Sequence, residues 1–279
     1  MDKEYSDYTS GRRRLYIIKI KGGFNIRLFY GNIFFMENVF EENVKIRYSE
    51  MDCNLVLKPS ALLMFLQDLA SDNAESLNFG YSYIIKHNLA WFLLKYRIEF
   101  EDYPCGLYDL TIKTQPRGYN KLFAFRDFEI LHDDKLIGRA ASTWALVDLD
   151  TKGMANVVDA LQGNPYMKLY EKREDDLVYG KIKLPEKFDI EKYFEIRFDD
   201  LDVNQHVNNA NYIVWAFEAL DFEFRKSRKL KTLDMMFKKE ITYGSKVLSC
   251  ASVFDDETIH AVKNAETNED LCIISAKWV

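Results

Sequence analysis

The sequence predicts an α+β fold from three observations. Each half of the chain has one helical pattern followed by strand-like runs between turn residues, which is typical of a helix packed on an antiparallel sheet. A segment of the first half is repeated in the second half. The aromatic fraction of 15% favours sheet, because aromatic side chains fit a pleated surface.

The repeated segment covers residues 44–68 and returns 150 positions later without a gap. A strand-then-helix unit that occurs twice indicates a duplicated fold. The length of 279 residues agrees with this, because a domain has roughly 150 residues. The matching residues are Ile46-Arg47-Tyr48 and Ile196-Arg197-Phe198, Met51-Asp52 and Leu201-Asp202, and Asn54 and Asn204.

In the first copy we expect a helix that has Pro59 near its start and Gly80 as its stop. One face of this helix contains Leu62, Leu66, Leu69 and Asn73. Turn signals separate the runs that follow the helix, so these runs predict strands. The predicted strands are 91–101, 108–115, 122–131 and 135–148.

We divide the chain into an N-terminal extension (1–35), a first domain (36–155), a polar connector (156–190) and a second domain (191–279). In the second domain, strands are expected after the helix at 233–243, 246–255, 258–265 and 271–278.

The extension has a basic triplet, Arg12 to Arg14, and an alternating strand-like run from Phe24 to Tyr30. The triplet resembles the start of a signal peptide, but Lys19 interrupts the apolar run that follows it. We therefore expect a cytoplasmic protein. One hypothesis is that Met36 is the natural start and that residues 1–35 do not belong to the native protein.

Composition excludes several classes of function. The net charge of −6 argues against nucleic-acid binding, which usually needs a basic excess. The four cysteines form no CxxC pair, so neither a zinc site nor a disulfide framework is indicated. The HExxH, P-loop and GxGxxG motifs are missing from the sequence, so no metal or nucleotide cofactor is expected.

The candidate site is the segment from Asp202 through Asn204 to His206, where polar groups stand at every second position. If this segment is extended, the three side chains share one face. The alternative is a turn in which Asp and Asn bind their own backbone. We expect Asn208 or Asn209 to cap a helix whose first N–H groups could hold a developing oxyanion. Its apolar positions are Ile213, Phe217, Leu220 and Phe224.

The two copies differ at the titratable position. Val56 stands in the first copy where the second has His206, and Lys58 and Pro59 replace Asn208 and Asn209. We therefore place the chemistry in the second half, and expect the first half to supply structure and a binding cavity.

The chain resembles the acyl-acyl-carrier-protein thioesterases from about Met36 to Val279. The similarity rests on DLDVNQHVNNxxY, on FKKEI with Glu240, and on HNLAWFLLKYRIEFEDYP in the first half. The resemblance implies a tandem hotdog fold, in which each half wraps an antiparallel sheet around a long helix. It also implies hydrolysis of the thioester between a fatty acyl chain and its carrier protein, without a cofactor.

By this resemblance, the catalytic residues are Asp202, Asn204, His206 and Glu240. We assign Glu240 to activating a water, His206 to holding or sharing the proton, Asn204 to positioning water or substrate, and Asp202 to orienting its neighbours. One position departs from many plant members, which have Cys directly after the Glu. Ile241 stands there, and its side chain cannot attack a carbonyl.

Three alternatives stay open: an acyl-CoA thioesterase of the same fold, a non-catalytic acyl-binding sensor and, less favoured, a hotdog dehydratase, whose HFP-type motif is missing from the sequence. Acyl chain length depends on many side chains and is not predicted. Because the duplication pairs two units in one chain, both a monomer and a homodimer are compatible with it.

Two further groups of residues have ordinary explanations. His87, His132 and His260 lack motif partners and are expected to be structural or exposed. Five cations between Arg225 and Lys231 fit a solvated helix end. The alternative function of this basic cluster (Arg225, Lys226, Arg228, Lys229 and Lys231) is docking of an acidic carrier protein.

Overall fold

The computed structural model describes residues 5–10, 13–20, 24–29, 39–106 and 109–279, in two compact units, 1–37 and 38–279. The first unit contains three antiparallel strands, β1 (Tyr5–Ser10), β2 (Arg13–Ile20) and β3 (Phe24–Phe29). The strand predicted from Phe24 is confirmed as β3. Tyr30 and Met36 lie outside the described residues.

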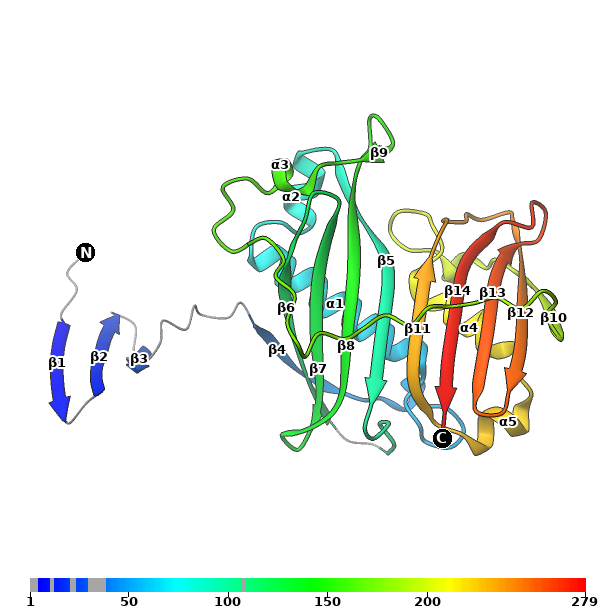
Figure 1. Cartoon of the computed structure of the whole chain (residues 1–279), viewed down its shortest axis with the longest axis horizontal. Helices are drawn as coiled ribbons and strands as arrows, with labels where there is room; N and C mark the ends of the chain where they lie inside the picture. The colour runs from blue at the N-terminus through cyan, green and yellow to red at the C-terminus, as the bar shows by residue number, and fades with distance from the viewer. Residues whose placement is uncertain (1–4, 11–12, 21–23, 30–38, 107–108) are drawn as a thin grey trace. The chain divides into compact units, whose positions relative to one another are not determined.

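The second unit is built on one antiparallel sheet of eleven strands, in the order β10-β12-β13-β14-β11-β5-β8-β7-β6-β4, with β9 beside β8 (Figure 1). The two halves of the chain meet where β5 pairs with β11. The strands are β4 (Phe40–Lys45), β5 (Leu89–Phe100), β6 (Asp109–Tyr119), β7 (Phe123–His132), β8 (Lys135–Asp148), β9 (Gly153–Met154), β10 (Ile190–Glu195), β11 (Leu230–Phe237), β12 (Lys246–Phe254), β13 (Glu257–Asn264) and β14 (Asp270–Trp278).

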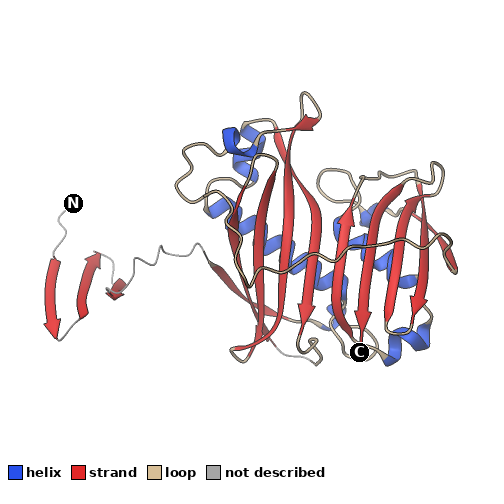
Figure 2. Ribbon diagram, viewed as in Figure 1, coloured by secondary structure: helices blue, strands red, loops and turns tan. Residues whose placement is uncertain are grey.

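Two main helices lie on the same side of this sheet, α1 (Pro59–Ser76) behind the first half and α4 (Asn209–Glu218) behind the second (Figure 2). They contact each other. Pro59 is the first residue of α1, where its missing N–H costs nothing. The residues that we placed on one face of this helix, Leu62, Leu66, Leu69 and Asn73, are all buried. The shorter helices are α2 (Tyr81–Lys86), α3 (Val157–Ala160) and α5 (Phe222–Ser227).

The repeat is also a repeat in three dimensions. In each copy a single 3₁₀ turn, at Tyr48–Glu50 and at Phe198–Asp200, leads into the same backbone arrangement. The N–H of Asp52 donates to the carbonyl of Val56 at 2.8 Å, and the N–H of Asp202 donates to that of His206 at 2.7 Å. The predicted duplication of an α+β unit is therefore confirmed.

The buried faces of the two main helices differ. Under α1, leucines alternate with the small residues Ala61, Ala70 and Ala74. The buried face of the ten-residue helix α4 is aromatic, and large rings that contact one another fill the space beneath it. These rings belong to Tyr212, Trp215, Phe217 and Trp278.

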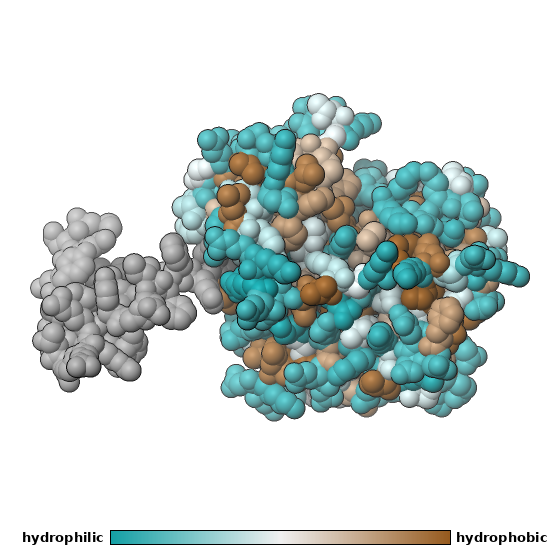
Figure 3. All heavy atoms as spheres, viewed as in Figure 1, coloured by the Kyte–Doolittle hydropathy of each residue, from teal (hydrophilic) through white to brown (hydrophobic). Residues whose placement is uncertain are grey.

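The second half of the connector forms a strap (residues 176–190) across the sheet face opposite the helices (Figure 1). The Tyr179 hydroxyl contacts that of Thr143 at 2.9 Å, and the N–H of Gly180 donates to Asp234 at 2.8 Å. Ile182 and Phe188 pack on a small apolar cluster of β12, β13 and β14. Hydrophilic residues dominate this face, with hydrophobic ones in separate patches (Figure 3).

Several predicted boundaries were wrong. The strand predicted over 233–243 ends at Phe237, so Glu240 lies in the loop after β11. The helix expected to continue to Phe224 ends at Glu218, and α5 starts anew because the Asp221 side chain caps it. Helix α2, which begins after Gly80, was not predicted. The strand predicted from Tyr108 starts among the described residues at Asp109.

Candidate functional site

Asp202 organises the turn that carries the candidate residues. Its Oδ1 accepts the backbone N–H of Asn204 at 2.8 Å and that of His206 at 3.3 Å. Gln205 adopts a left-handed conformation with φ of 65°. The extended segment that we expected is therefore wrong, and the alternative, a turn closed by its own aspartate, is observed. The turn still brings the Asn204 amide to 3.5 Å from Asp202 Oδ2.

His206 and Glu240 form the second part of the site. Nδ1 of His206 lies 3.2 Å from Oε2 of Glu240, and both side chains are partly exposed. The backbone holds the two loops together, because the N–H of Val207 donates to the carbonyl of Ile241 at 3.0 Å. An isolated antiparallel β-bridge between the backbones of His206 and Thr242 adds to this connection.

The electrostatic environment of Glu240 disfavours its charge. Burial raises the pKa of the Glu240 carboxyl above its ordinary value, the nearby His206 lowers it, and the carboxylate of Asp202 raises it further. The balance is a raised pKa, which is a property common to groups that exchange protons in active sites.

The start of α4 differs from the oxyanion site that we expected. Asn208 is the N-cap, as predicted, and its Oδ1 accepts the N–H of Ala210 at 2.9 Å. The N–H of Asn211 donates to the Asn208 carbonyl. These two N–H groups are therefore already bonded and do not serve a ligand. Asn209 turns toward the first half, where its Nδ2 lies 3.5 Å from Oε1 of Gln67 on α1.

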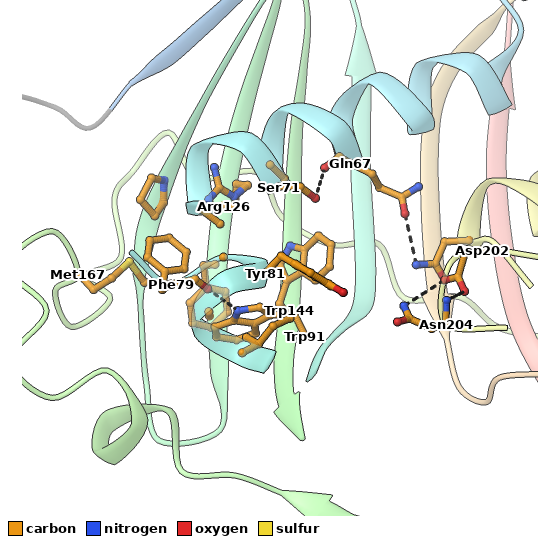
Figure 4. A pocket seen from close by; sticks show the side chains of 18 of the residues that line it. Gln67, Ser71, Phe79, Tyr81, Trp91, Arg126, Trp144, Met167, Asp202 and Asn204 are labelled. Atoms are coloured by element: carbon orange, nitrogen blue, oxygen red, sulfur yellow. Dashed lines mark hydrogen bonds between the residues drawn. The ribbon is translucent and has the colours of Figure 1, made fainter. Parts of the chain in front are cut away.

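A cavity of about 290 Å³ extends from the turn into the first half of the chain (Figure 4). Asp202, Val203, Asn204 and Asn209 line it on the side of the second copy. His206 and Glu240 are not among its lining residues, so of the four predicted catalytic residues only Asp202 and Asn204 border the cavity. Its walls in the first half are mainly apolar and include Phe79, Trp91, Phe125, Trp144 and Met167.

Four polar lining residues were missed by the sequence reasoning: Gln67 and Ser71 of α1, Arg126 of β7, and Asn209 as a lining residue rather than a cap. Gln67 and Ser71 stand four positions apart in a predicted helix, so helical spacing could have placed them on one face. The position of Arg126 carries no comparable signal, because a strand residue faces the core or the solvent according to its register.

The other histidines contact neighbouring groups in the fold. His87 stacks on Tyr83. Nδ1 of His132 lies 3.3 Å from the carbonyl of Asp109. His260 is fully buried beside Thr258, and burial lowers its pKa to about 3, so it is neutral at physiological pH. Ile241, where a cysteine nucleophile could have stood, is buried in the core.

Two family models match the chain. The one described as acyl-ACP thioesterase N-terminal domain matches residues 37–163, and the one described as acyl-ACP thioesterase C-terminal domain matches residues 183–278. The chain belongs to the acyl-ACP thioesterase family. The order of the two matches agrees with the order of the two copies in the structure.

Curated relatives carry names from the same family. The chain is 26% identical to the oleoyl-acyl carrier protein thioesterase of Coriandrum sativum over 256 residues, which cover 82% of the chain and 66% of the relative. It is 25% identical to the palmitoyl-acyl carrier protein thioesterase of Gossypium hirsutum over 242 residues, or 82% and 59%. The chain thus spans less than two thirds of the length of these relatives.

Solved structures share the fold. An acyl-ACP thioesterase from Bacteroides thetaiotaomicron superposes with a TM-score of 0.78 at 22% identity, over 87% of this chain and 98% of that one. The 12:0-ACP thioesterase from Umbellularia californica gives 0.77 at 22% identity, over 87% and 97%. The predicted tandem hotdog fold is confirmed.

The described part of the chain contains no group of three or more His, Cys, Asp or Glu side chains arranged to hold a metal ion. None of its helices has the length and apolar character that crossing a membrane requires.

The cap of α4 can be tested against its counterpart in the first copy. Asn208→Ala removes an acceptor for a helix N–H and should lower the free energy of unfolding by about 1 kcal/mol. Lys58→Ala is the matched control, because the Lys58 side chain makes no cap hydrogen bond to α1. Urea denaturation of both variants measures the difference, and equal losses would contradict a capping role for Asn208.

Proposed function

We propose that the chain hydrolyses the thioester of a fatty acyl group on acyl carrier protein, releasing the free acid and the carrier. The observation that supports this most directly is the junction of a polar turn, Asp202 to His206, with a largely apolar cavity. Such a cavity suits an alkyl chain, and the turn suits the thioester at its end. The names of the relatives agree with this activity.

The contact between His206 and Glu240 suggests how a water is activated. Nδ1 of His206 faces Glu240, so the N–H at this position donates a hydrogen bond to the carboxylate. The other ring nitrogen, Nε2, is then left without a proton and can act as the base. We therefore assign the base to His206 and an orienting role to Glu240, whereas the assignment made from sequence gave the activation of water to Glu240. Asn204, which borders the cavity, has an amide that can donate to the carbonyl oxygen.

The reaction then proceeds in two steps, addition of water and loss of the thiol. Nε2 of His206 takes one proton from water as its oxygen attacks the thioester carbon, which gives a tetrahedral oxyanion. The oxyanion collapses and breaks the carbon–sulfur bond. The proton held by His206 passes to the leaving thiolate, and the acid product loses its own proton to solvent.

In this proposal the two domains have different roles in binding and catalysis. The first domain (36–155) holds the acyl chain, the connector (156–190) braces the sheet, and the second domain (191–279) supplies Asp202, Asn204, His206 and Glu240. The aromatic filling beneath α4 supports this division, because it occupies the space that an acyl chain would need.

A cytoplasmic location is a further proposal. Cys250 and Cys272 are buried thiols, which suits a reducing compartment.

Hydrolysis of a panel of acyl-carrier-protein thioesters, with matching acyl-CoA esters alongside, tests the function. We expect turnover of the carrier esters and a loss of roughly 10²- to 10⁴-fold in kcat for His206→Ala, because the general base is gone. Glu240→Ala should lose less, and His87→Ala, an exposed histidine elsewhere, should be unchanged.

Other outcomes of this panel point to the alternatives. Preferential turnover of CoA esters would indicate an acyl-CoA thioesterase. If neither class is turned over but acyl ligands bind, the chain is an acyl sensor. Full activity of His206→Ala would overturn the mechanism.

The raised pKa of Glu240 predicts a pH dependence. The carboxylate orients His206 only when ionised, so its contribution to kcat is lost as the pH falls through a pKa that lies above the ordinary 4.5. Glu240→Gln cannot titrate and should be slower at neutral pH, with a rate that changes less as the pH is lowered toward 4.5. Identical pH profiles for the two enzymes would contradict this role.

The basic cluster is our proposed docking surface for the carrier protein. It lies beside the first-copy turn, because the Asn54 amide donates to the carbonyl of Lys226 at 2.9 Å. Arg225 of the cluster is paired with Glu218, the last residue of α4. Helix α4 is about 15 Å long, and its other end is at Asn208, so the carrier's flexible arm must bridge a span of roughly this length.

Reversing two charges of the cluster tests docking. Lys226→Glu with Lys229→Glu should raise KM for carrier-bound substrate roughly tenfold at low salt, since complementary charge speeds encounter. A short thiol ester of the same acyl chain is the control and should be unaffected. Equal effects on the two substrates would refute docking at this surface.

A further inference from the structure

Two charged side chains line the cavity, and they lie at different places along it. Asp202 belongs to the turn described above. Arg126, on β7, lies beneath α1 at the other side of the view in Figure 4 and is only 5% exposed. A guanidinium in the wall of a cavity for a hydrocarbon chain is unexpected, because burying a charge without a counterion is costly.

The partners of Arg126 are neutral. Its Nη1 donates to Oδ1 of Asn73 at 2.7 Å and to the hydroxyl of Thr114 at 3.1 Å. Among the described residues, neither Nε nor Nη2 makes a hydrogen bond, and no carboxylate pairs with the guanidinium. Burial lowers the pKa of Arg126 to about 10, so the side chain remains charged at neutral pH.

Two other arginines of the same sheet are paired with carboxylates. Arg117, 3% exposed, contacts Asp127 at 2.6 Å and Asp176 at 2.7 Å. Arg97 pairs with Glu99 and Asp234. Each has two carboxylates, whereas Arg126, which faces the cavity, has none within the described chain.

The row of side chains next to Arg126 is also polar. Arg126 pairs in register with Ser142 of β8, which pairs with Tyr96 of β5. The Tyr96 hydroxyl is buried and has no hydrogen-bond partner in the part of the chain that is described. Ser142 and Tyr96 do not line the cavity, so Arg126 is the member of this row that can donate to a ligand.

We propose that Arg126 binds an oxygen carried by the acyl chain, so that the preferred substrates are thioesters of oxygenated acyl groups rather than of plain hydrocarbon chains. This inference rests on the proposed function. A plain chain has only C–H groups and would leave the donors of Arg126 unmet, whereas a hydroxyl or carboxylate oxygen accepts from them.

Helix α1 gives the scale for the position of that oxygen. Gln67 contacts Asn209 beside the turn, and Asn73, the partner of Arg126, is six residues further along α1. The separation along the helix axis is about 9 Å. An extended chain advances about 1.2 Å per bond, so the oxygen stands roughly seven or eight bonds from the thioester carbon.

The test compares three carrier-protein thioesters of equal length: octanoyl, 8-hydroxyoctanoyl and 7-carboxyheptanoyl. We expect wild-type kcat/KM for at least one oxygenated ester to exceed that for octanoyl by roughly 10- to 100-fold, as for a hydrogen bond to a charged group. Arg126→Met should abolish this preference. Arg139→Met is the matched control, because Arg139 contacts Asp175 in the connector, away from the cavity, and should keep the preference.

Binding of the free acids gives a readout that does not need catalysis. Trp91 and Trp144 line the cavity, so quenching of their fluorescence reports occupancy. If the oxygenated acids bind more tightly than octanoic acid but no thioester is hydrolysed, the proposed function fails, while the assignment of Arg126 as the group that binds the oxygen stands. If wild type prefers the plain chain in both assays, the inference is overturned, whether or not Arg126→Met folds.

Discussion

The pairing of β5 with β11 is the contact on which the rest of the molecule depends. It joins two helix-on-sheet units into one antiparallel sheet, and it sets α1 beside α4. Asp234 lies at this junction, where it is the cross-strand neighbour and ion-pair partner of Arg97. The strap adds a hydrogen bond there, from the N–H of Gly180 to Asp234. Without this junction the Asp202 turn would not face the cavity of the other half.

Duplication allowed the two copies to specialise. Both retain the aspartate-closed turn, which is a backbone structure and needs only Asp52 or Asp202 to accept two N–H groups. Val56 in the first copy cannot exchange a proton, whereas His206 can. The second copy has in turn filled the space under α4 with aromatic rings. The cavity and the titratable groups thus come from different copies.

The buried arginines on the two faces of the sheet have different kinds of partner. On the strap side of the sheet, buried arginines are neutralised by carboxylates, as at Arg117. On the helix side, Arg126 faces the cavity with neutral partners only. The difference matters because the charge of a paired guanidinium is already compensated within the fold, while an unpaired one at a cavity wall gains most when a ligand supplies the acceptor.

The sequence by itself determined the duplication, the main strands, the start of α1 and the residues of the polar turn. These features depend on local signals: a gapless repeat, alternation of apolar residues, Pro59 at a helix start and Asn208 at a cap. Only the tertiary structure decided that the Asp202 segment is a turn rather than a strand, because the choice rests on hydrogen bonds that either backbone could make. It also decided that Glu240 lies in a loop against His206, and that Arg126 borders the cavity. Those contacts join residues far apart in the chain, so they depend on register and packing, which spacing in the sequence does not encode.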